Sequence, residues 1–229
     1  MKAQLFERVL ADRAAKRPVA LVTRLADGLQ ALVYHDDVSG ELALTPEQID
    51  ETRQRLRGNR SGSLGQHDET LFVRCHATPP RMIVVGAVHI AQALAPMAAM
   101  VGYEVTVIDP RRAFATRERL PGVSMVSLWP DEAIAQVGID AETAVVTLSH
   151  DPKLDDPALV AALRSPAFYI GALGSTRTHA KRVERLTAAG LGDALGRIHA
   201  PIGLDLGGRA PVEIAVSILA QVIQARYTR

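Results

Sequence analysis

The stretch MIVVGAVHIAQALAPMAAMVGYEVTVIDPRR, from Met82 to Arg112, decides the expected fold. The run MIVV predicts a buried strand, Gly86 a tight turn, and the residues that follow a helix and a second strand, EVTVI. This is the layout of a dinucleotide-binding unit, in which three small residues shape the turn. Gly86 and Ala91 fit that fingerprint. Val88 occupies the position where a second glycine lets the backbone approach a diphosphate, so ordinary NAD binding is expected to be weakened or displaced.

The same rhythm continues toward the C-terminus. The apolar runs VSMVSL, TAVVTL and AFYIG alternate with helical segments, as expected for parallel strands that are buried on both faces. Residues 81–229 are therefore predicted to form a Rossmann-like, doubly wound parallel α/β domain. Residues 1–80 lack this rhythm. A hairpin, a helix with Thr45 and Gln48 in a capping box, and a strand at Thr70–His76 predict a small α+β domain there, and ATPPR marks the boundary.

Helices are predicted near both ends of the chain. In MKAQLFERVLADRAAKRP the apolar residues Leu5, Phe6, Val9 and Leu10 recur at helical spacing, which indicates an amphipathic helix and not a signal peptide. The segment RAPVEIAVSILAQVIQARYTR predicts a helix that is apolar around most of its circumference. Packing on its own sheet or a homodimer interface would each bury that surface.

Composition excludes several classes of function. The 26 Lys and Arg residues nearly balance the 25 Asp and Glu residues, and aromatic residues make up 4% of the chain, so neither a basic field nor a stacking platform for nucleic acid is expected. The single cysteine, Cys75, allows no internal disulfide and fits a reducing, cytoplasmic location. Met82–Tyr103 carries no formal charge, but His89, Gln92 and Pro96 interrupt it, so no membrane span is predicted.

Ligands of open α/β sheets bind beyond the carboxyl ends of the strands. Asp109 follows the strand EVTVI, at the position where a carboxylate accepts hydrogen bonds from a ribose. Its neighbours Arg111 and Arg112 either contact a phosphate or lie on a solvated surface. His89 either donates to an anion or caps the helix locally. His150 follows the strand TAVVTL, at the same edge.

A second glycine-bearing turn lies in YIGALGSTRTHAKR. Gly171 and Gly174 precede Ser175, where free amides at a helix start suit an anion, and basic residues follow. Alternatively, the glycines only turn the chain and the basic residues coat the helix. The loop APIGLDLGGRAP, with Asp205, offers a flexible rim. No nucleophile stands out beside a base, and the seven histidines are scattered, so neither a catalytic residue nor a metal site is predicted.

Four ordered motifs carry a family resemblance: VVGAVHIAQALAPMAAMVGYEVTVIDPR, VVTLSHDPKLDD, YIGALGSTRTHAKRVERL and APIGLDLGGRAPVEIAVSILAQVI. They resemble the XdhC/CoxI family of xanthine dehydrogenase accessory proteins. The resemblance implies a factor that binds molybdenum cofactor, in its pterin or dinucleotide form, and delivers it to a molybdenum hydroxylase, with a cysteine desulfurase as a further partner. The family's N-terminal GSVSGGCVE-like segment reads DDVSGELAL here, with no cysteine.

Two other functions stay open from the sequence: an NAD(P)-dependent oxidoreductase and a non-catalytic interaction module. The resemblance favours an accessory factor over both. The residues predicted to contact the cofactor are Gly86, Val88, His89, Asp109, Arg111, Arg112, His150, Gly171, Gly174, Ser175 and Asp205.

Overall fold

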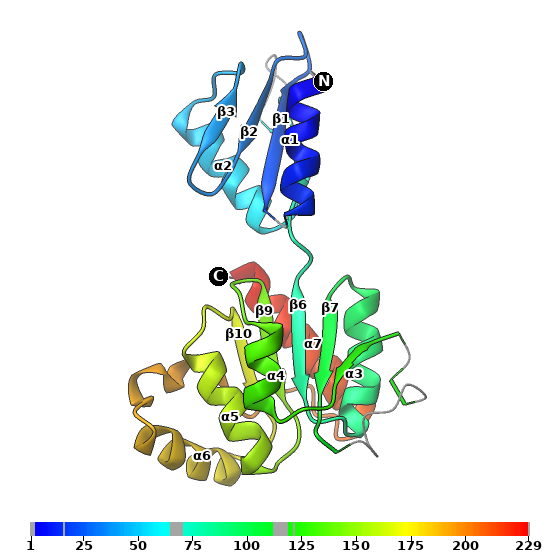
Figure 1. The fold of residues 1–229 in the computed structure, drawn as a ribbon, viewed down its shortest axis with the longest axis vertical. Coiled ribbons are helices and arrows are strands. Elements are labelled where there is room, and N and C mark those ends of the chain that lie inside the picture. The colour runs from blue at the N-terminus through cyan, green and yellow to red at the C-terminus, as the bar shows by residue number, and fades with distance from the viewer. Residues whose placement is uncertain (1–2, 16, 65–70, 112–118, 121, 229) are drawn as a thin grey trace. The chain divides into compact units, whose positions relative to one another are not determined.

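The computed structural model describes residues 3–15, 17–64, 71–111, 119–120 and 122–228. The chain divides into two compact units, Met1–Thr78 and Pro79–Arg229 (Figure 1), and each is described by itself. Both predicted classes are confirmed: the first unit combines helices with an antiparallel sheet, and the second is a Rossmann-like parallel α/β unit.

The first unit is a sheet with a helix on each face. Its elements are α1 (Ala3–Ala14), β1 (Val19–Arg24), β2 (Gln30–Val33), β3 (Val38–Gly40), α2 (Pro46–Arg57), β4 (Gly62–Leu64) and β5 (Leu71–His76). Among the described residues the strands pair antiparallel in the order β3-β2-β1-β5-β4. Alternate residues of β1 serve the two faces: Val22 packs with Leu56 of α2, and Leu21 packs with Val9 of α1. Cys75 is buried on the α2 face, and burial raises the pKa of its thiol.

Helix α1 forms as predicted, but it buries only part of its apolar stripe. Val9 is buried, whereas Phe6 and Leu10 are 45% and 44% exposed. The helix is held to the sheet by a polar contact as well, because the Tyr34 hydroxyl donates to Asp12 Oδ2 at 2.7 Å. The buried Asp12 therefore replaces part of the apolar contact that the helical spacing indicated.

The predicted capping box of α2 is confirmed. Thr45 Oγ1 accepts from Gln48 N at 3.3 Å, and Gln48 Oε1 accepts from Thr45 N at 2.9 Å. We expect Thr45→Ala to lower the free energy of unfolding of the first unit by about 1 kcal/mol, because one amide of the first turn loses its partner. Urea unfolding followed by far-UV circular dichroism measures this loss. Thr45→Ser, which keeps the hydroxyl, should restore most of it, and an equal loss in both variants would contradict the capping argument.

The second unit alternates strands and helices. Its elements are β6 (Arg81–Val85), α3 (His89–Met100), β7 (Glu104–Ile108), β8 (Ser124–Val126), α4 (Pro130–Val137), β9 (Thr143–Thr147), α5 (Pro152–Leu163), β10 (Tyr169–Ala172), α6 (Thr176–Ala188), a 3-10 helix (Gly192–Arg197), β11 (Ile198–His199) and α7 (Pro211–Thr228). Within the described ranges the strands are parallel and follow the order β11-β10-β9-β6-β7-β8.

The central strand β6 is buried on both faces, which explains its continuous apolar run. Met82 and Val84 pack into the core that contains α3 and α7, whereas Ile83 and Val85 pack into the core that contains α4 and α5. Figure 1 shows these helices on the two sides of the sheet. The domain is therefore a three-layer, doubly wound fold.

Helix α7 packs along α3 and the sheet, so its own domain buries most of its apolar surface. Ile218 and Val222 are fully buried, while Val212 and Val216 are 58% and 44% exposed. Packing on its own sheet is confirmed, and a homodimer through this helix stays a prediction. Over the part of the chain that the structure describes, we find no helix with the length and apolarity needed to span a bilayer.

Candidate functional site

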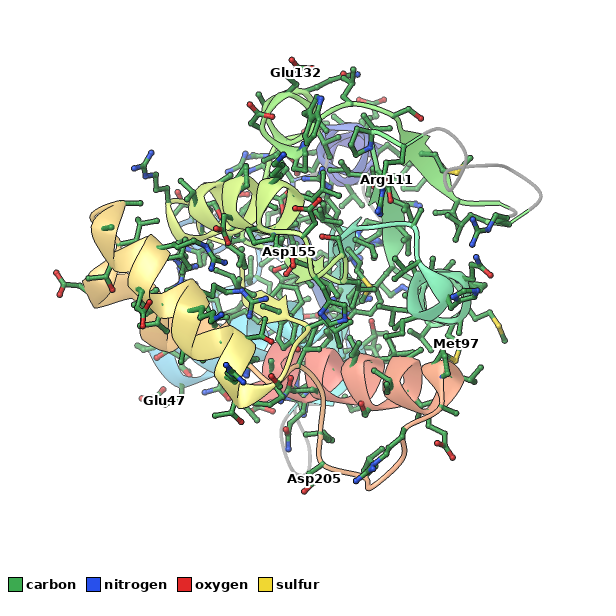
Figure 2. The ribbon with its side chains drawn as sticks, turned by 90° about the horizontal axis from the view of Figure 1, so that it is seen from below. Glu47, Met97, Arg111, Glu132, Asp155 and Asp205 are labelled. Atoms are coloured by element: carbon green, nitrogen blue, oxygen red, sulfur yellow. The ribbon has the colours of Figure 1, made fainter. Side chains whose placement is uncertain are left out.

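Strand order reverses between β6 and β9, and their carboxyl ends form the centre of the candidate site. From β6 the chain passes to β7 and β8 on one side, and then returns to β9 and β10 on the other. Gly86 follows β6 with φ of 104°, and a Cβ there would lie 3.0 Å from Ser149 N and 3.1 Å from Ser149 Cβ. Glycine is required here because the two strand ends approach so closely. Figure 2 looks toward the same edge, with Asp155 at the start of α5.

Asp109 is fully buried and makes hydrogen bonds within its own chain. Its Oδ2 accepts from Ala87 N and from Arg111 Nη2, both at 2.8 Å, and its Oδ1 accepts from Arg111 N at 3.0 Å and Arg111 Nε at 2.9 Å. Burial by itself would raise the pKa of this carboxyl, but the hydrogen bonds from Arg111 and Ala87 outweigh it and hold the pKa below its usual value. Four donors occupy the lone pairs that a ribose would need.

The remaining predicted residues of the first turn have local roles. Val88 is the N-cap residue of α3, and its partly buried side chain packs against the core on the α3 and α7 face. His89 begins α3 and is exposed. Arg112 lies outside the described residues. The turn therefore holds a strand, a helix and Asp109 together, and its Ala87 amide is already satisfied.

The second turn positions the start of α6. Gly174 has φ of 136°, and a Cβ there would lie 3.0 Å from the Thr178 side chain. Ser175 is the N-cap of α6, where its Oγ accepts from Thr178 N at 3.2 Å. Gly171 lies inside β10, where a Cβ would overlap the side chains of Ile202 and Tyr169. Gly171 thus serves packing, whereas Gly174 and Ser175 shape the helix start.

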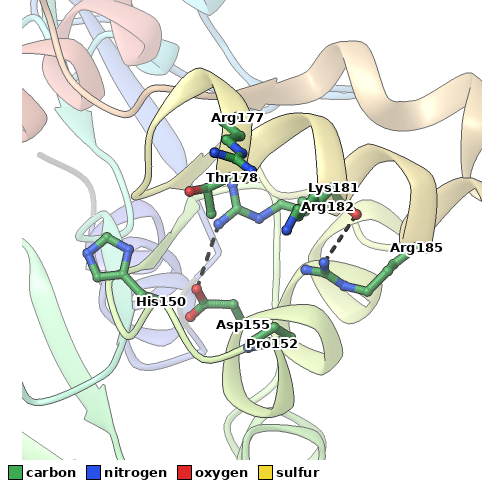
Figure 3. Close-up of a pocket in the computed structure, with 8 residues that line it drawn as sticks. All are labelled: His150, Pro152, Asp155, Arg177, Thr178, Lys181, Arg182 and Arg185. Carbon is green, nitrogen blue, oxygen red and sulfur yellow. Dashed lines mark hydrogen bonds and ion pairs between the residues drawn. The ribbon is translucent and has the colours of Figure 1, made fainter.

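A pocket of about 290 Å³ lies between the start of α5 and the face of α6 (Figure 3). Helical spacing places its cations together, because residues four apart lie on one side of a helix. Arg177, Lys181 and Arg185 form one row, and Thr178 and Arg182 form the adjacent row. The residues that line the pocket are His150, Pro152, Asp155, Arg177, Thr178, Lys181, Arg182 and Arg185.

Arg182 and Asp155 are both about 2% exposed, yet they form only a long ion pair. Arg182 Nη2 lies 3.8 Å from Asp155 Oδ2 and donates to Leu173 O at 2.9 Å. Asp155 Oδ1 accepts instead from Ser149 Oγ at 2.6 Å. Burial raises the pKa of the Asp155 carboxyl and lowers that of the Arg182 guanidinium. Both groups therefore have spare capacity to bind a ligand.

His150 is the predicted site residue that lines this pocket. It has φ of 61°, a conformation that few residues other than glycine adopt. Its neighbour Asp151 caps α5 by accepting from Lys153 N at 2.9 Å, so Asp151 serves the helix. Asp205 is exposed in the loop before α7, where its Oδ1 accepts from Gly207 N, and it is not among the residues that line the pocket.

Comparison with protein families matches residues 82–222 to the XdhC Rossmann domain. The chain belongs to the XdhC family. Among curated relatives of this XdhC chain, PaoD of Escherichia coli K12, named a molybdenum cofactor insertion chaperone, is 35% identical over 215 residues, which cover 93% of the chain and 57% of PaoD. A Bacillus subtilis protein, named as a probable component of xanthine dehydrogenase, is 30% identical over 166 residues, which cover 71% of the chain and 48% of that protein.

The XdhC chain thus spans about half the length of these two relatives. Its fold is shared with a crystal structure described as a xanthine dehydrogenase of Bacillus halodurans. The TM-score is 0.74 at 22% identity, and the match covers 99% of the chain and 67% of that structure.

Sequence reasoning missed part of the pocket in this XdhC domain. The row Arg177, Lys181 and Arg185 carries a readable signal, because its spacing of four residues puts three cations on one helical face. Asp155 carries none. It stands in a helix that is otherwise buried through its apolar residues, and only the packing of α5 against α6 brings it to Arg182.

Proposed function

We propose that this chain binds molybdenum cofactor as cargo at the carboxyl edge of its second unit and passes it to a molybdenum hydroxylase. The observation that carries the proposal is the cationic pocket beside the reversal of strand order, the place where doubly wound folds bind their ligands. It is supported by the similarity to PaoD, whose name describes cofactor insertion and whose match extends over 93% of this chain.

The residues at this edge suit the anionic end of such a cofactor, which carries a phosphate or a diphosphate. Arg177, Lys181 and Arg182 present positive charge to the pocket, and Arg182 is buried with nitrogens left to donate. A guanidinium binds phosphate oxygens through paired N–H donors. When bound, the cofactor would supply the redox chemistry of the client enzyme, and the role of this chain would be to bind and orient it. A cysteine desulfurase partner, a homodimer and a cytoplasmic location stay predictions.

An NAD(P)-dependent oxidoreductase has less support. That function needs a carboxylate free to accept hydrogen bonds from a ribose, and Asp109 is the residue in that position. Both of its oxygens already accept two hydrogen bonds each, from Ala87 and Arg111. Since no observation favours this chemistry, we propose cofactor binding alone.

The test is to identify what the protein carries when it is purified from a host that makes molybdenum cofactor. We expect oxidised pterin at near-stoichiometric yield by mass spectrometry after denaturation, and none from a host that cannot make the cofactor. The loaded protein should also activate a cofactor-free molybdenum hydroxylase in vitro. Release of NAD(P) in place of pterin, or an empty protein that takes up no added cofactor, would overturn the proposal.

A further inference from the structure

We propose that the pocket between α5 and α6 is a phosphate-binding site with Arg182 as its central donor, and that the first glycine turn binds no phosphate. The location of the site stands on its own geometry. Only the identity of the natural ligand, the phosphate or diphosphate end of the cofactor, rests on the proposed function.

The first turn is unsuited to an anion for two reasons. In dinucleotide-binding folds the diphosphate lies against the start of the first helix, where it meets free amides. Here the Asp109 carboxylate occupies that place and accepts from Ala87 N at 2.8 Å. A phosphate would have to displace or approach this buried negative charge. The Val88 side chain also stands at the position where the backbone would need to be bare.

The second turn presents the opposite arrangement, in the side chain of Arg182. This residue is 2% exposed, and neither its Nε nor its Nη1 has a hydrogen-bond partner among the described residues. Buried donors of a charged group are costly to leave unpaired. The guanidinium lines the pocket, and Figure 3 shows it reaching from α6 toward Asp155. An oxyanion in the pocket would satisfy the two nitrogens at once in a bidentate pair.

The surroundings of Arg182 add to this preference. Arg177 and Lys181 are exposed on the pocket wall, and their charges raise the local concentration of anions. Arg185 is less available, because it forms an ion pair with Asp156. Asp155 is the one carboxylate among the described residues of the lining, and it is turned toward Ser149, whose Oγ donates to it at 2.6 Å.

The size of the pocket limits what it takes. Pockets that hold a whole drug-sized ligand begin at about 300 Å³, and this one measures about 290 Å³. It therefore suits the phosphate-bearing end of a molecule, with the remainder outside. A single phosphate would satisfy Arg182 alone, whereas a diphosphate would also reach Lys181 and Arg177 on the wall. Inorganic phosphate and pyrophosphate are therefore the probes that distinguish the two forms.

The experiment is calorimetric titration of the cofactor-free protein with inorganic phosphate and with pyrophosphate at fixed ionic strength. We expect binding of at least one probe, and Arg182→Met should weaken it about tenfold or more, because it removes a charged pair of donors. Lys181→Met, on the exposed wall, should weaken pyrophosphate about threefold, since a screened surface charge contributes less. Arg164→Met removes the same charge from an exposed position outside the lining and should bind as the wild type does.

Several results would overturn the inference. They are absence of binding by the wild-type protein, equal binding by folded Arg182→Met, and an equal loss in Arg164→Met, which would indicate a general charge effect. If Arg182→Met does not fold, Lys181→Met decides, and unchanged pyrophosphate binding then counts against the site. Pterin that co-purifies while neither probe binds would leave the proposed function standing and remove this site. Probe binding without pterin would do the reverse.

Discussion

Gly86→Ala is expected to lower the free energy of unfolding of the second unit by about 3 kcal/mol or more, since backbone strain and overpacking each cost about 1–3 kcal/mol. The strain arises because φ at Gly86 is 104°, and the overpacking because the new Cβ would lie 3.0–3.2 Å from the Ser149 main chain and side chain. Neither strand end can yield easily, since β6 and β9 are paired along their lengths. The single tryptophan, Trp129, lies in the second unit, so its fluorescence during urea unfolding reports on that unit alone.

Gly102→Ala is the matched control for this change. Gly102 has φ of 94°, but no atom of the described residues lies within 4 Å of the position that a Cβ would take. It should therefore lose only the strain, about 1–2 kcal/mol. The difference between the two variants measures the close approach of Gly86 to Ser149. Equal losses would show that this contact contributes nothing.

Asp109→Ala is expected to destabilise the second unit by about 3 kcal/mol at neutral pH, because removing one partner of a buried, hydrogen-bonded charge leaves the other groups unsatisfied. The groups left behind are the buried Ala87 N–H and the Arg111 guanidinium. Asp109→Asn keeps one acceptor oxygen and should lose about half as much. Unfolding by urea, read from Trp129, measures both. A loss below about 1 kcal/mol in Asp109→Ala would show that the network around Asp109 is not structural.

The pH dependence of this loss has a defined sign. The pKa of Asp109 lies below its usual value in the folded protein, since the hydrogen bonds from Arg111 and Ala87 outweigh its burial. The stability that Asp109 contributes is therefore complete above its unfolded pKa of about 3.9 and is lost as the pH falls through the lower folded pKa. The difference between wild type and Asp109→Ala should be constant from neutral pH to about 5 and shrink below about 4. A difference that grows on acidification would contradict this assignment.

Much of the fold could be predicted because its signals are local. The continuous apolar runs of β6, β7 and β9 identify strands buried on two faces, and the capping box at Thr45 marks the start of α2. The glycine positions were also informative, since Gly86 and Gly174 both require positive φ. Each of these features depends on a few neighbouring residues and on the preferences of the backbone.

The use of the candidate site was decided by tertiary structure. Sequence spacing placed Asp109 where a ribose binds, but only the folded chain shows its carboxylate buried against Ala87 and Arg111. The same holds for Arg182, whose burial beside Asp155 requires α5 and α6 to pack together. Sequence alone determined the alternation of strands and helices, because hydrophobic period and backbone geometry are properties of short segments. Which polar groups stay free for a ligand depends on desolvation and on partners distant in the chain, so only the packed structure could settle it.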